Sequence, residues 1–77
     1  MNLLFTTKAC PNCPAAEKVL QEHGIQYKKI YAEDEPDSAY AFGIMQAPTL
    51  VEAESHVLHV GLSNIIRFAE EQDIPQF

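Results

Sequence analysis

Hydrophobic and polar positions change their spacing along the first part of this chain of 77 residues, and the changes predict a strand, a helix and a second strand. Residues 2–6 form a short apolar run, which is typical of a buried strand. Residues 15–23 instead repeat with the period of an amphipathic helix, which Gly24 ends as a C-terminal cap would. The expected inward face of that helix holds Ala16, Val19, Leu20 and His23. Residues 25–31 alternate imperfectly, but their β-branched and aromatic side chains favour a strand.

A second, shorter helix is predicted in the middle of the chain by its capping residues. Asp34 or Glu35 can cap its start. Pro36 fits the first turn, where a missing N–H is tolerated, and the helix is expected to end near Gly43.

The last part of the chain predicts a hairpin and a final helix. Residues 49–51 and 56–60 are two short apolar strands separated by a turn at residues 52–55, which indicates an antiparallel pair. Gly61 then breaks the chain before an amphipathic helix, and residues 74–77 form a short tail. The expected inward positions of this helix are Leu62, Ile65, Ile66 and Ala69.

The predicted order is therefore β-α-β-α-β-β-α, an α/β arrangement in a single domain over residues 1–77. A strand, a helix and a strand in succession imply a parallel pair joined by a right-handed crossover. We expect one mixed four-stranded sheet, flanked by helices, with its strands in the spatial order 2-1-3-4. The residues that follow the first strand then lie at the carboxyl end of a central strand, where ligands of open α/β sheets bind.

Charge and composition exclude several classes of partner. The formal net charge of −6 argues against binding the phosphate backbone of nucleic acid. Most carboxylates fall in two clusters, residues 33–37 and 70–73, which we interpret as solvated surface. No apolar run approaches the roughly 18 residues that span a bilayer, and residues 1–5 lack the features of a signal peptide. We therefore expect a cytoplasmic protein that binds neither nucleic acid nor a membrane.

The two cysteines of the chain stand three positions apart, in the run Cys10-Pro11-Asn12-Cys13. A structural disulfide normally closes a longer loop, and small secreted scaffolds usually carry two or more bridges. A lone Cys-x-x-Cys without a signal peptide instead indicates redox chemistry. Lys8 is near enough in sequence to add positive charge beside Cys10, although a lysine facing solvent is an equal alternative.

The spacing of the two cysteines suits a reversible redox cycle. Two thiols in the first turn of a helix are close enough to bridge without moving the backbone. Cys10 lies at the amino end of the predicted helix, where N–H groups and the helix dipole stabilise a thiolate. We expect Cys10 to attack a substrate disulfide and Cys13, one turn deeper, to resolve the mixed disulfide.

The main alternative is a binding module whose cysteines ligate a metal or an iron–sulfur cluster. Structural zinc takes four ligands, and the cysteines supply two of them. His56 and His59 would point to opposite faces of a strand, and His23 ends the first helix. We therefore interpret the histidines as surface or satisfied core residues and expect no resident metal or cofactor. A thioredoxin-like adaptor or metal carrier stays open as the second hypothesis.

At this point the chain resembles the glutaredoxin branch of the thioredoxin superfamily over nearly its whole length. The matching residues are Cys10 and Cys13 after a strand, Ala47-Pro48-Thr49 before the hairpin, and Gly61 after it. The resemblance implies a thioredoxin-like fold and a thiol–disulfide oxidoreductase that reduces protein disulfides. Although most X–Pro bonds are trans, it also implies that Pro48 is cis and lies beside the dithiol, where it presents the preceding backbone to substrate.

The same resemblance implies roles for the neighbours of these residues, and the departures from it bear on the electron donor. Substrate binding falls to Ala47, Thr49 and Gly61, and support of the active site to Lys8, Pro11, Asn12 and Pro48. Glutaredoxins typically carry tyrosine at the position of Asn12, and an acidic residue after a Gly-Gly pair where Ser63 and Asn64 stand here. These departures favour thioredoxin reductase or a similar flavoprotein over glutathione as donor. The short length and Pro14 look like the small redoxins that serve ribonucleotide reductases.

Overall fold

The order of helices and strands that the sequence predicts is confirmed in a computed structural model of the protein, which describes residues 1–72. The strands are β1 (Asn2–Thr6), β2 (Tyr27–Tyr31), β3 (Thr49–Val51) and β4 (Leu58–Val60), and the helices are α1 (Cys13–Glu22), α2 (Pro36–Ala41) and α3 (Leu62–Gln72). The predicted α/β order of elements is therefore present in the described part of the chain.

The four strands form one mixed sheet in the predicted order, β2-β1-β3-β4. β1 runs parallel to β2, with Leu4 opposite Lys29 and Thr6 opposite Tyr31. β1 and β3 are antiparallel, as are β3 and β4. The carboxyl end of the central strand β1 thus leads directly into the segment that carries both cysteines.

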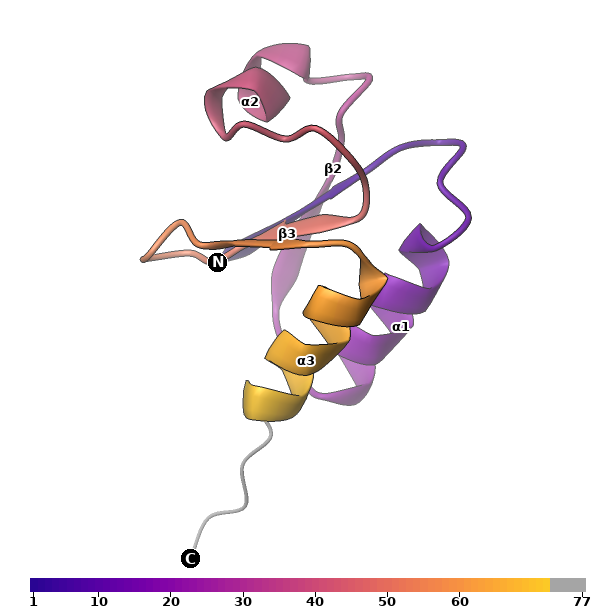
Figure 1. The fold of residues 1–77 in the computed structure, drawn as a ribbon, viewed down its shortest axis with the longest axis vertical. Coiled ribbons are helices and arrows are strands. Elements are labelled where there is room, and N and C mark those ends of the chain that lie inside the picture. Colours follow the sequence, from indigo (N-terminus) through magenta and orange to yellow (C-terminus); the bar gives the residue numbers. More distant parts are fainter. Residues whose placement is uncertain (73–77) are drawn as a thin grey trace, which may run out of the picture.

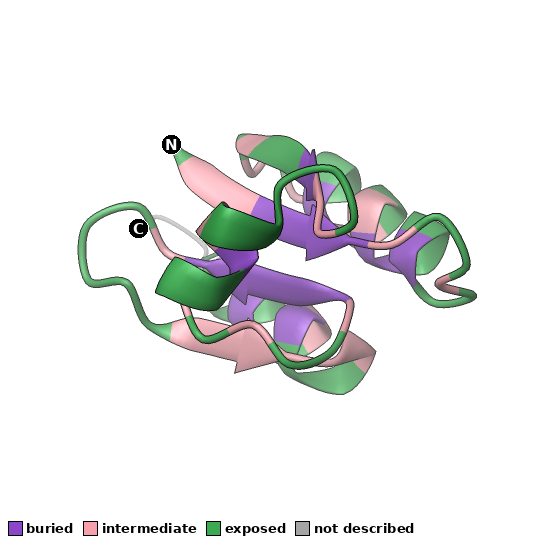
Figure 2. Cartoon of the chain, turned by 90° about the horizontal axis from the view of Figure 1, so that it is seen from above, coloured by how far each residue is buried: buried purple, intermediate pink, exposed green. Residues whose placement is uncertain are grey.

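The helices cover the sheet on both faces, and each face has its own apolar cluster. Figure 1 shows α1 and α3 side by side on one face and α2 on the other. Successive side chains of β1 alternate between the two clusters: Leu4 packs with α1 and α3, whereas Phe5 packs on the face of α2. Buried residues concentrate along β1 and β3 in the middle of the sheet (Figure 2). The first cluster consists of Leu4, Ala16, Leu20, Leu50, Ile65, Phe68 and Ala69.

Several element boundaries differ from the sequence prediction. α1 begins at Cys13, two residues before the predicted start. β2 begins at Tyr27, because Ile25 packs against the first cluster as part of the turn after α1. Glu35 occupies the N-cap of α2, but its carboxylate makes no capping hydrogen bond, so the predicted side-chain cap is wrong.

The last strand is shorter than residues 56–60, and this prediction is also wrong. The turn extends through His56, which has a φ of 59° and donates its N–H to the carbonyl of Glu52 at 3.1 Å. Pairing therefore starts only at Leu58. The tail predicted at residues 74–77 lies outside the described residues. Within residues 1–72, no helix is long and apolar enough to cross a membrane.

Candidate redox site

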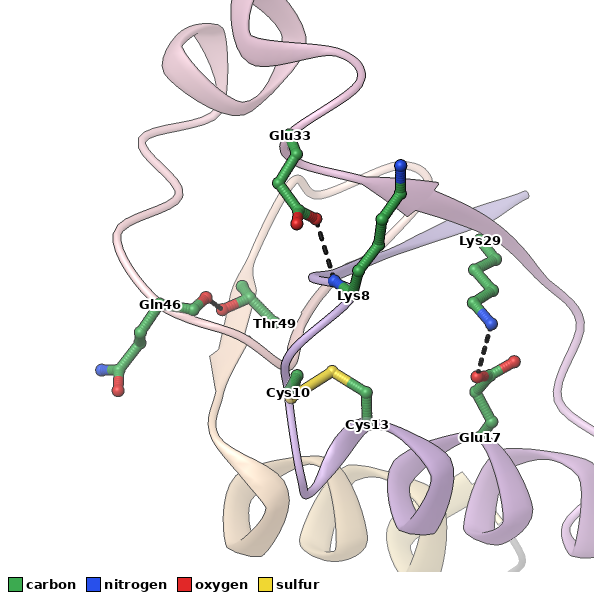
Figure 3. Close-up of a disulfide and its surroundings, with 8 residues drawn as sticks. All are labelled: Lys8, Cys10, Cys13, Glu17, Lys29, Glu33, Gln46 and Thr49. Carbon is green, nitrogen blue, oxygen red and sulfur yellow. Dashed lines mark hydrogen bonds and ion pairs between the residues drawn. A yellow bond between two sulfur atoms is a disulfide. The ribbon is translucent and has the colours of Figure 1, made fainter.

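The two cysteines are joined by a disulfide at the point where β1 leads into α1 (Figure 3). Their Cα atoms are 5.5 Å apart, which is within the range that a disulfide spans without moving the backbone. Cys13 is the first residue of α1 and is buried, with 4% of its surface exposed. Cys10 precedes the helix and is half-buried. Cys10 is therefore the more accessible of the two cysteine residues.

The start of α1 leaves its first turn open toward the disulfide. Asn12 stands at the N-cap, but its side chain makes no capping hydrogen bond. Pro14 has no N–H, so the first intrahelical bond near the start runs from the N–H of Ala16 to the carbonyl of Asn12, at 3.0 Å. Both Pro11 and Asn12 are exposed. The uncapped positive end of the helix dipole thus lies beside the sulfurs and stabilises negative charge there.

Pro48 follows a cis peptide bond, as the family resemblance implies. Its ring is fully buried, and its carbonyl accepts a hydrogen bond from the N–H of Gly61 at 2.8 Å. The hydroxyl of Thr49 donates to the carbonyl of Gln46 at 2.6 Å, which closes the turn that contains the proline. Two of the predicted substrate-binding residues, Thr49 and Gly61, therefore hold the shape of this segment through internal bonds. The third, Ala47, is half-buried.

Lys8 is exposed and pairs with a carboxylate on the neighbouring loop. Its Nζ lies 3.3 Å from Oδ1 of Asp34, and its backbone N–H donates to Oε1 of Glu33 at 2.9 Å. Figure 3 shows the ammonium group of Lys8 pointing away from the disulfide. The ammonium group of Lys8, which the sequence suggested as a positive charge near Cys10, is therefore paired with the carboxylate of Asp34.

A second group of polar side chains ties α1 to β2 beside the disulfide. One carboxylate oxygen of Glu17 lies 3.0 Å from Nζ of Lys29, and the other accepts from the hydroxyl of Tyr27 at 3.1 Å. Interaction with the side chain of Tyr31, followed by that with Glu17, raises the pKa of Lys29, so this lysine is cationic at neutral pH. Burial raises the pKa of Tyr27, which keeps its hydroxyl protonated and able to donate.

A cavity of about 130 Å³ opens beside the disulfide, and most of the residues that line it were not predicted from the sequence. Besides both cysteines it is lined by Thr6, Glu17, Lys29 and Tyr31. The signal that could have found them is the strand register. Since the carboxyl ends of parallel strands meet at one edge, the last residues of β1 and β2 must lie near the dithiol.

The histidines do not join the cysteines. His59 is half-buried on the edge strand β4, with Nε2 2.6 Å from Oε2 of Glu52 and its ring centroid 4.5 Å from that of Phe68. Nδ1 of His23 lies 2.9 Å from the carbonyl of Val19. Within residues 1–72, no three His, Cys, Asp or Glu side chains gather as a metal site would require.

These features together define a class of protein: a Cys-x-x-Cys disulfide at the start of a helix, after the central strand of such a sheet, with a cis-proline before β3, is typical of a thioredoxin-like fold. The chain belongs to the glutaredoxin family, because the glutaredoxin family model matches residues 2–57.

Individual proteins are also similar to this chain. A protein named thioredoxin from Methanocaldococcus jannaschii is 37% identical over 54 residues, which is 62% of this chain and 64% of the relative. The chain therefore matches less than two thirds of that protein's length. Two solved structures share the fold, each with a TM-score of 0.66 over 91% of this chain. They are a glutaredoxin from Brucella melitensis (20% identical, 78% covered) and thioredoxin 1 from Thermosipho africanus (14% identical, 90% covered).

Proposed function

We propose that this protein is a thiol–disulfide oxidoreductase that reduces disulfides in other proteins through Cys10 and Cys13. The observation that carries the proposal is the unequal burial of a bonded cysteine pair at the start of α1. An accessible sulfur can meet a substrate, while a buried partner waits within bonding distance to release it. Membership of the glutaredoxin family supports this reading.

The proposed reaction has two exchanges. The Cys10 thiolate attacks one sulfur of the substrate disulfide, forms a mixed disulfide and displaces the other substrate sulfur as a thiolate. The Cys13 thiol loses its proton to solvent and attacks the Cys10 sulfur, which releases the second substrate thiolate. Two electrons have then moved from this protein to the substrate, and the Cys10–Cys13 disulfide remains. A donor dithiol must reduce it for a further cycle, which favours a reducing compartment such as the cytoplasm.

The residues around the dithiol would position the substrate. The backbone of Ala47, which precedes the cis-proline, would face the incoming chain, and Pro48 would hold that backbone beside Cys10. Thr49 and Gly61 would act by fixing the turn through the hydrogen bonds described above. The exposed residues Lys8, Pro11 and Asn12 would form the rim that a partner touches.

We expect a Cys13→Ser variant to stop at the mixed disulfide, because serine cannot attack the Cys10 sulfur. Incubated with insulin, the variant should carry a covalently bound insulin chain that dithiothreitol releases, seen as an added mass under non-reducing conditions. Cys10→Ser is the matched control, since it leaves only the buried sulfur. Equal trapping by the two variants, or trapping by neither, would reject the proposed roles.

We further propose a flavoprotein of the thioredoxin reductase type as electron donor, and ribonucleotide reductase as one candidate among disulfide-containing substrates. Glutaredoxins place an acidic residue near position 64 for the glutathione amino group, whereas here Nδ2 of Asn64 donates to the carbonyl of Val60 at 2.7 Å. This amide is part of the helix start and offers no negative charge. No resident cofactor is needed for the proposed exchanges.

We therefore expect turnover with glutathione and glutathione reductase to be weak, and Asn64→Asp to raise it about tenfold. That factor corresponds to about 1.4 kcal/mol of regained binding, on the scale of one hydrogen bond to a charged group. NADPH consumption in a coupled assay is the measurement. Ser55→Asp adds the same charge on the exposed β3–β4 turn and serves as control. An unchanged rate for Asn64→Asp would contradict the assignment of this position.

A further inference from the structure

The hydroxyl of Thr6 is buried and unpaired beside the disulfide. Thr6 is the last residue of β1 and has no exposed surface. Among the residues that the structure describes, its Oγ1 is the one buried side-chain polar atom without a hydrogen-bond partner. Native proteins rarely keep a buried polar atom without a hydrogen bond. A role at a reactive centre is one of the recognised reasons for such an unpaired atom.

The direction of the Thr6 side chain follows from the alternation of β1. Leu4 faces α1 and α3, Phe5 faces the opposite side, and Thr6 therefore faces α1 again. Cys13 begins that helix, and Thr6 lines the same cavity as both cysteines. Thr6 thus lies on the same face of the sheet as α1 and borders the cavity that both cysteines line.

The charged groups of this cavity already have partners. Glu17 binds Lys29 and Tyr27 with its two oxygens, and Lys8 pairs with Asp34. The sulfurs are the groups whose hydrogen-bonding capacity changes in the redox cycle. A disulfide sulfur is a weak acceptor, whereas a thiolate carries a full charge and accepts strongly.

We propose that the Thr6 hydroxyl donates a hydrogen bond to the Cys13 sulfur once the disulfide is reduced, and thereby favours the dithiol state. The inference rests on the proposed function and deepens it by naming a residue that sets the redox balance. When a donor dithiol reduces the bond, two electrons enter, the Cys10–Cys13 bond breaks and the donor becomes a disulfide. Cys10 and Cys13 are released as thiolates that solvent can protonate, and the Cys13 sulfur then finds the unpaired O–H of Thr6. The Thr6 hydroxyl, which has no hydrogen-bond partner in the oxidised state, therefore gains one in the reduced state.

The test is the equilibrium of the purified protein with oxidised and reduced dithiothreitol, read by thiol alkylation and mass. We expect Thr6→Val, which keeps the shape and removes the hydroxyl, to shift the equilibrium toward the disulfide five- to tenfold. A tenfold shift corresponds to about 30 mV for a two-electron couple. Thr6→Ser retains the hydroxyl and should stay near the wild-type equilibrium. Thr6→Ala is a second hydroxyl-free variant, in case valine disturbs the fold.

Ser38→Ala is the control, because it also removes a single hydroxyl but lies in α2, on the opposite face of the sheet from α1 (Figure 1). The equilibrium of this variant should not move. A merely structural role for Thr6 would lower the thermal stability of both redox states without shifting the balance. The proposal is overturned if the hydroxyl-free variants at position 6 keep the wild-type equilibrium, or if Ser38→Ala shifts it equally. This equilibrium involves no protein substrate, so it is independent of whether insulin is reduced, and failure of the proposed function is detected separately.

Discussion

The Cys10→Ser variant is expected to lose the reduction of insulin disulfides almost completely, falling to the rate of dithiothreitol alone. Only a thiolate attacks a disulfide at a useful rate, and the serine hydroxyl is not ionised at neutral pH. The remaining sulfur belongs to Cys13, a residue with 4% of its surface exposed, so we expect it not to reach a disulfide in another protein. We expect a loss on the order of 10³-fold or more, the scale on which removal of an enzyme's nucleophile acts. The measurement is insulin turbidity against time, with the background rate subtracted.

The comparison with Cys13→Ser makes this prediction specific to the attacking sulfur. Both variants remove one sulfur and break the same disulfide, so any effect on folding is shared. They differ in the chemistry that remains: Cys13→Ser can still attack once, whereas Cys10→Ser cannot attack at all. If Cys10→Ser kept more than about a tenth of the wild-type rate, which is 1.4 kcal/mol or less of lost transition-state stabilisation, the proposed mechanism would be wrong.

The elements of the fold were predictable because local signals agreed with one another. The apolar run at residues 2–6, the helical spacing of Ala16 and Leu20, and the glycines after the first two helices all point to the same topology. The hydrophobic pattern was less reliable at the ends of helices and strands, because tertiary packing decides at which residue each element begins or ends. Ile25 looks like a strand residue but packs in a turn against the first cluster. A side chain can fit the hydrophobic pattern of a strand even where its backbone makes no hydrogen bonds to a neighbouring strand.

Apart from the cis-proline, which the family resemblance implied, the candidate site was predictable only where its residues stand close together in sequence. Cys10 and Cys13 share one turn, so their spacing carries the chemistry. Thr6 and Lys29 line the same cavity because of the register of β1 and β2, and this register cannot be read from a single sequence. Phe68 was missed for a related reason: it faces inward from α3 beside His59, on a side of the helix that the sequence reading left unassigned.

Leu20→Ala is the second large effect that we expect, and it concerns the support of the dithiol rather than its chemistry. Leu20 is a residue of α1 and has no exposed surface. It packs in the cluster between this helix, α3 and the sheet, together with Leu4, Leu50 and Ile65. Replacing it leaves a cavity in a closely packed cluster, and such changes lower the free energy of unfolding by about 2–5 kcal/mol. A chain this small is stabilised by only about 4–12 kcal/mol. We therefore expect the melting temperature to fall by at least 10 °C or so, measured by circular dichroism.

Val57→Ala is the control for this prediction, since Val57 lies on the exposed β3–β4 turn with 48% of its surface accessible. Surface changes of this kind stay within about 0.5 kcal/mol, so its melting temperature should remain near that of the wild type. The disulfide closes a loop within one turn at the start of α1, so it cannot hold the far end of the helix against the sheet. That task falls to Leu20 and its neighbours. Equal melting temperatures for the Leu20 and Val57 variants would show that α1 is anchored elsewhere, and that the cluster does not fix the helix on which Cys13 stands.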